Sequence, residues 1–455
     1  MTRQRAPVEP PVVLTVAGSD SGGGAGIQAD LKTIEAGGAF GTSVITSVTA
    51  QHTRGVQSTH LLPLEEIRAQ YDAVTDDFAV GAMKTGMLAT EDVIELVTER
   101  VAESSIPAVV DPVMVAASGD RLLDDGAESA YHELAREATL LTPNADEAEV
   151  LTGIEVDSTE AAIRAGERLV DDGVDAALVK GGHVDGEDVV DSFVTDDEIE
   201  QISHPRVDTE ANHGSGCMLS AAIATRLAYG DDLSTAIKTG TDLLARAVRY
   251  SLNVGEGPGA VHHMVAARDR AEREPTAEQV REIVDALAEA NVGPLVPEVG
   301  MNVAGATPYA EVPEECAAVE GRIGRTRAGL TARGDIRYGA SDHVAQFLLA
   351  AREYHPEYRF ALNTRFDADV EAALQGLDWP VGEYGRTEQP AEVAAEEGAT
   401  MEWGVRQAFS EAVTPPVAVI DRGEHGKEPL VTLLAADAPT LIDRTTTLHE
   451  TVGGN

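Results

Sequence analysis

The sequence predicts an α/β protein in which a large domain with a parallel sheet precedes a separate smaller α/β domain. Over residues 1–265, short apolar runs rich in β-branched residues alternate with helical patterns, which favours a parallel sheet with helices on both faces. Beyond residue 276 the motifs of the first domain do not recur, and Gly-Arg pairs become frequent. Because ligands of such sheets bind beyond the carboxyl ends of the strands, the polar residues that follow each strand are the candidate site.

The elements of the larger domain follow one another in a regular order. The apolar run 12–17 predicts the first strand, and a glycine-rich turn separates it from a helical pattern over 25–36. Further strands are predicted over 44–49, 107–111, 140–142 and 176–180, and further helices over 91–103 and 218–224.

The junction between the two domains is predicted from composition. The segment 266–276 is charged and weakly apolar and contains Pro275, which is typical of a linker. The predicted boundaries are therefore 1–265 for the first domain and 277–455 for the second. A helix over 277–290 is expected to open the second domain.

Composition and charge exclude several classes of protein. The chain has 455 residues, which is enough for two to four domains of about 100–200 residues. Hydrophobic residues make up 43%, and 34 Lys and Arg against 78 Asp and Glu leave a formal net charge of −44. Nucleic-acid binding needs a basic face, and an anionic membrane surface would repel this chain. We therefore expect small-molecule partners, with no nucleic acid and no membrane.

The balance of charges also indicates a cellular environment. Only 5 of the 34 basic residues are Lys, and an acidic, Lys-poor surface suits a cytosol rich in salt. The sequence thus favours a halophilic cytoplasmic protein; the alternative is a merely acidic mesophilic protein. Two cysteines fit a reducing cytosol, residues 1–11 lack the apolar core of a signal peptide, and no apolar run approaches the ~20 residues of a membrane span.

A glycine-rich segment over 17–26 follows the first strand and opens a helix. Its glycines allow positive φ and the close approach of a ligand, and the helix N-terminus supplies free N–H groups. The segment matches neither a Walker loop nor a dinucleotide fingerprint. A turn with a purely structural role is the alternative.

A second candidate segment runs from His213 to Cys217 and precedes a buried helix. Three consecutive N–H groups at the helix start would form an anion hole for a transferring phosphoryl group. Cys217 would lie in the first helical turn, where the helix dipole lowers the pKa of a thiol, and its thiolate could take a proton from a substrate hydroxyl. The alternative is a small buried core residue.

Three charged residues follow predicted strands. Asp111 ends one strand, Lys180 ends another, and Glu147 follows a third. The two carboxylates could organise an Mg²⁺–phosphate group. Glu147 could equally be the first-turn acid of a capped helix. Lys180 is one of only five lysines, so a merely solvating role is less expected.

The second domain concentrates its basic residues in one stretch. Five arginines fall within sixteen residues, with three glycines among them and one more on either side. A helix that Ser341 or Asp342 can cap follows, with His343 in its first turn. Arginine forks beside a helix N-terminus form a phosphate or pyrophosphate site; the alternative is an Arg-rich solvated hairpin that pairs with neighbouring acids. The run 295–304 has the look of a strand, and the spacing does not indicate a function for Asn302. The arginines are Arg322, Arg325, Arg327, Arg333 and Arg337.

Seven segments of the first domain occur together in one family: AGSDSGGGAGIQADLKT, VTAQHT, MKTGML, VVDPVM, LTPNADEAEVLTG, LVKGGH and NHGSGCMLSAAIA. With them, residues 12–262 resemble the ThiD-type hydroxymethylpyrimidine and hydroxymethylpyrimidine-phosphate kinases of thiamine biosynthesis. The resemblance implies a ribokinase-like doubly wound sandwich that uses ATP and Mg²⁺ to phosphorylate the pyrimidine and then its monophosphate. Pyridoxal kinases share the superfamily, so side activity on pyridoxine-type substrates stays open.

The same resemblance implies roles for single residues. The second phosphorylation acts on a phosphate oxygen, which needs no strong base. Cys217, the base implied for the first phosphorylation, should therefore matter less for the second. Asp20 and Gln51 would hold the pyrimidine ring, with Met87 against it. Lys180 would contact phosphates, and Asp111 and Glu147 would organise Mg²⁺. Cys217 would be the base of the first phosphorylation, and the anion hole would be formed by Gly214, Ser215 and Gly216.

Residues 278–450 resemble archaeal ThiN-type thiamine phosphate synthase domains through PEVGMNVAGA, GRIGR, GDIRYGASDHVAQFLLAARE and VIDRGEHGKEP. The resemblance implies condensation of hydroxymethylpyrimidine diphosphate with hydroxyethylthiazole phosphate, with Arg322 and His343 as catalytic residues and Arg337 and Asn302 as substrate-binding residues. A non-catalytic ligand sensor is the alternative, but a sensor would not need both Arg322 and His343. For the kinase domain, the resemblance implies a homodimer.

Overall fold

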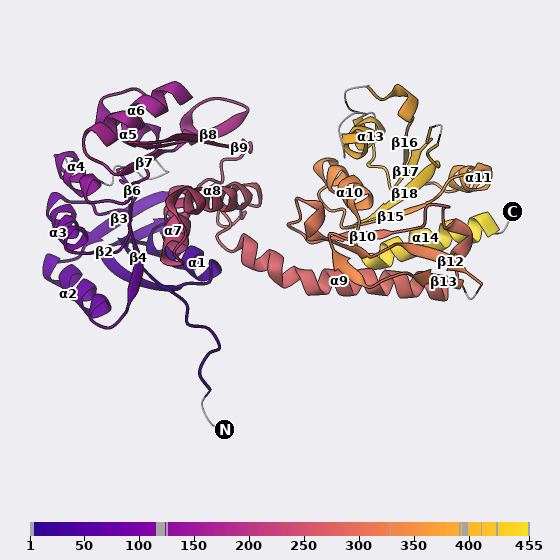
Figure 1. Ribbon diagram of the computed structural model, residues 1–455, viewed down its shortest axis with the longest axis horizontal. Coiled ribbons are helices and arrows are strands. Elements are labelled where there is room, and N and C mark those ends of the chain that lie inside the picture. The colour runs from indigo at the N-terminus through magenta and orange to yellow at the C-terminus, as the bar shows by residue number, and fades with distance from the viewer. Residues whose placement is uncertain are drawn as a thin grey trace. The chain divides into compact units, whose positions relative to one another are not determined.

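A nine-stranded sheet lies at the centre of the first of two compact units in this computed structural model (Figure 1). The structure describes residues 4–453 except 115–122, 124–125, 328, 391–392, 394–398, 411 and 425. The two units are Met1–Ala267 and Arg268–Asn455.

The sheet of the first unit has the order β3-β2-β1-β4-β5-β6-β7-β8-β9. In this order the strands from β2 to β7 are parallel, and β3, β8 and β9 extend the two edges by antiparallel pairing. The strands are β1 (Val12–Asp20), β2 (Phe40–His52), β3 (Gly55–Leu61), β4 (Val80–Thr85), β5 (Ala108–Val110), β6 (Leu140–Leu141), β7 (Ala176–Val179), β8 (Asp188–Thr195) and β9 (Ile199–Pro205).

Helices cover both faces of this sheet, because alternate side chains of each strand enter different cores. Leu14 and Val16 pack with α2, α3 and α4 on one face, whereas Val13 packs with α1, α7 and α8 on the other. The predicted α/β class is therefore confirmed, and every strand and helix predicted for this unit has a counterpart. The helices are α1 (Gly26–Ala36), α2 (Leu64–Thr75), α3 (Glu91–Ala102), α4 (Glu128–Arg136), α5 (Ala145–Thr152), α6 (Thr159–Asp171), α7 (Ser215–Ala228) and α8 (Leu233–Arg249).

The second unit is built on a seven-stranded sheet of order β14-β11-β10-β15-β18-β17-β16. It is antiparallel except for the parallel pair β16 and β17. One core contains α9, α11 and α14, and the other contains α10 and α13. Its strands are β10 (Val303–Ala306), β11 (Cys316–Val319), β14 (Ile336–Tyr338), β15 (Phe360–Arg365), β16 (Val381–Tyr384), β17 (Ala418–Asp421) and β18 (Leu430–Ala435), with a separate hairpin of β12 (Ile323–Thr326) and β13 (Gly329–Ala332). Its helices are α9 (Val265–Glu289), α10 (Asp342–Tyr354), α11 (Ala368–Gly376), α13 (Ala399–Ser410) and α14 (Ala438–Gly453).

The segment 266–276, predicted as a linker, is helical: α9 is continuous through it and contains Pro275, and the boundary between the two units falls within it, between Ala267 and Arg268. Ala, Arg and Glu, which are strong helix formers, fill most of this stretch. Tertiary contacts hold the helix on both sides of the proline: buried Asp269 accepts from Thr307, and Thr276 accepts from Arg359 over 3.1 Å. These contacts offset a proline penalty of about 3 kcal/mol.

The predicted strand over 295–304 is also largely wrong. A 3₁₀ turn covers Gly293–Leu295, Gly300 has φ +89, and β10 begins only at Val303. Pro297 and Gly300 interrupt the extended backbone, and the apolar side chains are buried without a strand.

Neither cysteine forms a disulfide: Cys217 and Cys316 are both free thiols. Among the described residues, no helix is both long enough and apolar enough to cross a membrane.

Candidate active site

The loop after β1 closes around the carboxylate of Asp20. The N–H groups of Gly22, Gly24 and Ala25 donate to it over 2.8, 2.9 and 2.8 Å. Burial opposes ionisation, but hydrogen bonds from His213 and the loop amides hold the pKa of Asp20 below its ordinary value. Asp20 is therefore an ionised group that fixes the shape of the glycine-rich loop.

Gln51 and Met87, which were predicted together with Asp20 to contact the pyrimidine ring, lie beside this loop. Near the end of β2, the main chain of Gln51 makes two hydrogen bonds of 2.8 Å with the Ser21 hydroxyl. Met87 is 9% exposed and packs on Gly18, where an added Cβ would lie 2.5 Å from the Met87 Cε atom. The parallel strands thus bring Asp20, Gln51 and Met87 to one place.

A charged cluster lies beyond the carboxyl ends of β5, β6 and β7. The Lys180 Nζ atom lies 3.0 Å from Asp111 Oδ1 and 4.0 Å from Glu147 Oε2. Glu147 also forms a capping box with Asn144 at the start of α5, so the predicted helix-cap role is present together with the site. Burial raises the pKa of Glu147 to about 7 against the opposing charge of Lys180. The cluster offers one cation and two carboxylates at the strand ends.

The start of α7 faces this cluster. Gly214 has φ +85, and an added Cβ there would lie 1.9 Å from the Gly24 carbonyl oxygen. An added Cβ on Gly216 would lie 3.3 Å from Lys180 Nζ and 3.4 Å from Asp111 Oδ2. The glycines therefore let the first N–H groups of the helix approach the charged cluster, although the Ser215 N–H already donates to the Asn212 carbonyl oxygen over 3.1 Å.

In the second unit, the predicted catalytic residues are exposed. Arg322 has φ +72, and its guanidinium donates to the Val299 carbonyl oxygen. Arg337 on β14 pairs with Glu320 over 2.9 Å, and His343 lies in the first turn of α10, five residues after the end of β14. The hairpin β12–β13 and the Arg337 ion pair match the alternative of an Arg-rich hairpin that pairs with neighbouring acids. The same exposed arginines are also compatible with a phosphate or pyrophosphate site.

The amide of Asn302 lies inside the sheet. Its Nδ2 donates to the Val319 carbonyl oxygen over 3.0 Å, its Oδ1 accepts from the Val319 N–H over 3.1 Å, and its own N–H donates to Asn363. The side chain is 4% exposed. In this structure the Asn302 side chain joins strands.

Comparison with known families agrees with this geometry. A family model described as phosphomethylpyrimidine kinase matches residues 20–262, which is more than half of the chain. The chain belongs to the phosphomethylpyrimidine kinase family. The model described as thiamine-phosphate synthase ThiN matches residues 279–447. The chain thus joins a phosphomethylpyrimidine kinase domain to a ThiN-type thiamine-phosphate synthase domain, and the predicted enzyme class is confirmed.

Individual relatives support the kinase domain. The chain is 47% identical over 264 residues to the hydroxymethylpyrimidine/phosphomethylpyrimidine kinase of Streptomyces coelicolor, with 58% of this chain and 98% of the relative covered. It is 44% identical to the thiamine biosynthesis bifunctional protein ThiED of Geobacter sulfurreducens, with 59% and 56% covered. The ADP complex of Bacillus subtilis pyridoxal kinase superposes with a TM-score of 0.53 at 33% identity, covering 57% of this chain and 99% of that one. The ribokinase-like fold is confirmed.

The kinase domain corrects one sequence-based prediction about Cys217. Burial raises the pKa of this thiol to about 11, and the positive charge of Lys84 opposes the rise. The expected lowering by the helix dipole is wrong for this structure, because desolvation of a thiolate outweighs the dipole of the first helical turn. With this pKa only a small fraction of the Cys217 thiol is thiolate at neutral pH.

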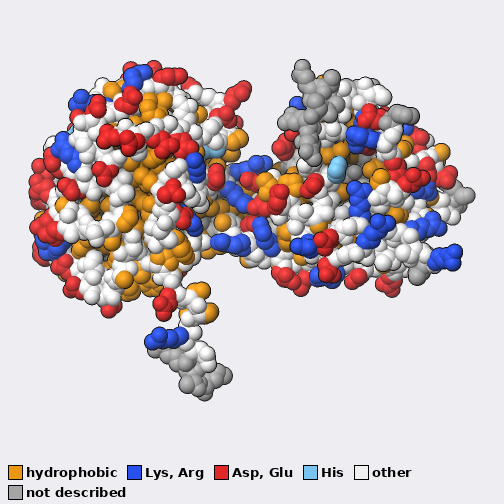
Figure 2. All heavy atoms as spheres, in the orientation of Figure 1, with side chains coloured by type: hydrophobic (Ala, Val, Ile, Leu, Met, Phe, Trp, Pro, Cys, Tyr) orange, Lys and Arg blue, Asp and Glu red, His pale blue; other side chains and the backbone are white. Residues whose placement is uncertain are grey.

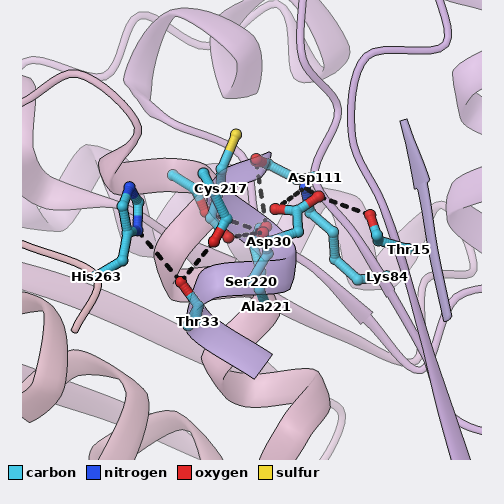
Figure 3. A network of polar contacts seen from close by, with 12 residues as sticks. Thr15, Asp30, Thr33, Lys84, Asp111, Cys217, Ser220, Ala221 and His263 are labelled. Carbon is cyan, nitrogen blue, oxygen red and sulfur yellow. Dashed lines mark hydrogen bonds and ion pairs between the residues drawn. The ribbon is translucent and has the colours of Figure 1, made fainter. Parts of the chain in front are cut away.

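Sequence reasoning missed a buried ion pair beside Cys217 in the kinase domain (Figure 3). Lys84 on β4 binds both carboxylate oxygens of Asp30 on α1, over 2.9 and 3.0 Å, and the Thr15 hydroxyl donates to the same carboxylate over 2.6 Å. The scarcity of lysine in this chain was the available signal, because Lys84 follows the apolar residues of β4 one position before its end.

The contacts of two histidines of the kinase domain were not predicted. His213 packs on Gly24 and lies 3.4 Å from the Asp20 carboxylate. His263 lies 3.2 Å from both the Gly24 carbonyl oxygen and the Thr33 hydroxyl. Neither contact is readable from spacing, because each joins segments that are roughly two hundred residues apart.

The ThiN-type domain contains one buried charge cluster that sequence reasoning missed. Arg386 donates to Asp421 over 2.6–3.1 Å, and the Tyr384 hydroxyl donates to the same carboxylate over 3.0 Å. Asp421 belongs to the VIDRGEHGKEP segment. Its carboxylate is satisfied within the cluster, which indicates a structural role.

Proposed function

We propose that the kinase domain transfers the γ-phosphoryl group of ATP to hydroxymethylpyrimidine and then to its monophosphate. The supporting observation is the convergence of Lys180, Asp111 and the start of α7 at the carboxyl edge of the parallel strands. A cation and free N–H groups stabilise the charge of a transferring phosphoryl group. A pyridoxal kinase of Staphylococcus aureus, similar at a TM-score of 0.52 and 30% identity, was solved with AMP-PCP and pyridoxal, which supports the use of ATP.

In the first phosphorylation, the thiolate form of Cys217 accepts the hydroxyl proton while the oxygen forms a bond to the γ-phosphorus. The bond between the γ-phosphorus and the bridging oxygen breaks, and ADP leaves. In the second phosphorylation a phosphate oxygen of the monophosphate attacks, and no strong base is needed. Asp20, Gln51 and Met87 orient the ring, and Gly214, Ser215 and Gly216 form the anion hole.

The residues present fit Mg²⁺. This ion is usually held by one or two carboxylates together with substrate phosphates and water, and Asp111 and Glu147 are two carboxylates that share Lys180 as neighbour. Within the described residues, no group of three or more His, Cys, Asp or Glu side chains is arranged to hold a metal by itself. Mg²⁺ bound here would neutralise charge on the phosphates, and Lys180 would hold them in place.

For the second domain, we propose that the thiazole nitrogen of hydroxyethylthiazole phosphate attacks the methylene carbon of the pyrimidine diphosphate. The carbon–oxygen bond breaks, and pyrophosphate leaves with the bonding electrons. Arg322 and Arg337 stabilise the departing pyrophosphate, and His343 donates to it or orients it. Asn302 would act only through the strands that it joins.

The decisive experiment is a coupled assay at molar KCl. The full chain is supplied with hydroxymethylpyrimidine, ATP, Mg²⁺ and hydroxyethylthiazole phosphate, and mass spectrometry detects thiamine phosphate. Arg322→Ala and His343→Ala run in parallel. Thiamine phosphate from the wild type, with pyrimidine diphosphate accumulating in the two variants, would support both activities and the second site.

Two other outcomes distinguish the alternatives. Pyrimidine diphosphate without thiamine phosphate from the wild type would favour a sensor role for the second domain. Because the structural neighbours include pyridoxal kinases at 30–33% identity, pyridoxal is the second candidate substrate. Replacing hydroxymethylpyrimidine by pyridoxal in the same assay measures that side activity directly.

We also infer a halophilic, cytoplasmic protein of haloarchaeal type that forms a homodimer. The net charge of −44 supports the first inference, and acidic side chains are spread over the visible face of both units (Figure 2). Salt screens such repulsion. Two free thiols are in keeping with a reducing compartment.

A further inference from the structure

The chain between α8 and α9 closes on itself. Leu252 and Ala260 exchange two backbone hydrogen bonds of 2.7 and 3.1 Å, so residues 253–259 form a loop with a paired base. Just beyond the base, the N–H of Val261 donates to the His213 carbonyl oxygen over 3.2 Å. We call residues 252–263 the clasp.

The apex of the clasp contacts the turn between β2 and β3. The N–H of Gly257 donates to the Thr53 hydroxyl over 3.0 Å. An added Cβ on Gly257 would lie 2.1 Å from the Thr53 carbonyl oxygen, and one on Gly255 would lie 2.5 Å from the Thr53 Oγ1 atom. Only glycine fits this close approach. Arg54 and Glu256 add an exposed ion pair of 2.8 Å, which contributes little by itself.

The other end of the clasp contacts the glycine-rich loop after β1. The His263 side chain is 4% exposed and lies 3.2 Å from the Gly24 carbonyl oxygen. The N–H of Gly24 in turn donates to the Asp20 carboxylate. His263 therefore contacts the loop that Asp20 shapes.

The clasp thus touches both segments that hold the ring in the proposed kinase reaction. Thr53 lies two residues after Gln51, and Ser21, next to Asp20, is hydrogen-bonded to the main chain of Gln51. The phosphate-side residues Lys180 and Asp111 follow other strands, β7 and β5.

We propose that the clasp is a positioning element for the pyrimidine subsite, in which Gly257 and His263 set the placement of Gln51 relative to Asp20. This proposal rests on the proposed kinase function. Its consequence is selective: loosening the clasp weakens binding of the pyrimidine and leaves binding of ATP unchanged.

The test is steady-state kinetics of the full chain with hydroxymethylpyrimidine and ATP varied separately. Gly257→Ala is expected to raise the KM for the pyrimidine at least tenfold and to leave the KM for ATP within twofold. Thr53→Ala removes one hydrogen bond and should raise the pyrimidine KM by about two- to tenfold, and Thr53→Ser should restore it. Gly376→Ala is the matched control, because an added Cβ there meets nothing within 4 Å.

An unchanged pyrimidine KM in Thr53→Ala, or an equal rise in the KM for ATP, would overturn the proposal. If Gly257→Ala does not fold, the Thr53→Ala and Thr53→Ser pair decides alone. A wild-type chain that does not phosphorylate hydroxymethylpyrimidine would refute the proposed function, and this proposal with it, which is a different result from an active wild type with insensitive variants.

Discussion

The Nζ atom of Lys84 lies 2.9 and 3.0 Å from the two carboxylate oxygens of Asp30, and neither side chain is exposed. The desolvation of both groups is offset only while they remain paired, with Thr15 satisfying a further lone pair of the carboxylate. The pair joins β4 to α1 next to α7, which carries Cys217. Loss of this pair should therefore lower both the free energy of unfolding and the rate of the kinase reaction.

Lys84→Met is expected to lower the free energy of unfolding by about 3–5 kcal/mol, because it leaves a buried carboxylate without its partner. Lys84→Met combined with Asp30→Asn should recover a large part of this loss. Urea unfolding at a fixed molar KCl concentration measures both variants. A double variant no more stable than Lys84→Met would show that the charge pairing is not what stabilises this region.

Cys217→Ala is expected to slow the first phosphorylation by about 10²–10⁴-fold and to leave the second within a few-fold, because only the first needs a base. Burial raises the pKa of Cys217 to about 11, so the thiolate fraction grows with pH. The wild-type rate of the first phosphorylation should rise by roughly tenfold per pH unit below that value. Rates with hydroxymethylpyrimidine and with its monophosphate, measured from pH 7 to 9, check both points; parallel losses would contradict the assignment.

Gly214→Ala is expected to abolish the kinase reactions and to spare the synthase reaction. An added Cβ would lie 1.9 Å from the Gly24 carbonyl oxygen, and Gly214 has φ +85, a conformation that side chains disfavour. The substitution should therefore displace the helix start from the glycine-rich loop. Formation of thiamine phosphate from supplied pyrimidine diphosphate is the internal control, and loss of both activities would indicate global misfolding.

His263 should make the kinase domain sensitive to acid. Burial lowers the pKa of this histidine from 6.5 to about 4, so below pH 6.5 the unfolded chain binds a proton that the folded chain does not. Stability due to this group is therefore complete above pH 6.5 and falls as the pH drops toward 4, at about 1.4 kcal/mol per pH unit. Urea unfolding of the wild type and His263→Gln between pH 7 and 5 tests this. Equal slopes for the two proteins would count against it.

Salt should stabilise the whole chain. With a net charge of −44, repulsion between carboxylates opposes the compact state, and the Debye length shortens from about 10 Å at 0.1 M to about 3 Å at 1 M salt. The thermal midpoint is expected to rise steadily between 0.1 and 2 M KCl. A midpoint that is flat or falls over this range would remove the support for a halophilic origin.

Local patterns were sufficient to predict much of the fold. Apolar runs such as those of β1 and β7 mark buried parallel strands, and the polar residues after them, such as Lys180, lie at the predicted edge. Prediction failed where local chemistry and tertiary packing disagree. Pro275 indicates a break, but buried contacts of Asp269 and Thr276 keep α9 continuous.

The amino-acid sequence by itself determined the α/β class of both units and the order of the strands and helices predicted for the first unit, because hydrophobic period and turn residues act over a few neighbouring positions. The kinase and synthase domains followed from the resemblance of longer motifs to known families. Tertiary structure alone decided the Lys84–Asp30 pair, the clasp on Thr53 and the raised pKa of Cys217. These depend on which distant segments exclude water from one another, and desolvation is a property of the packed chain that no local pattern contains.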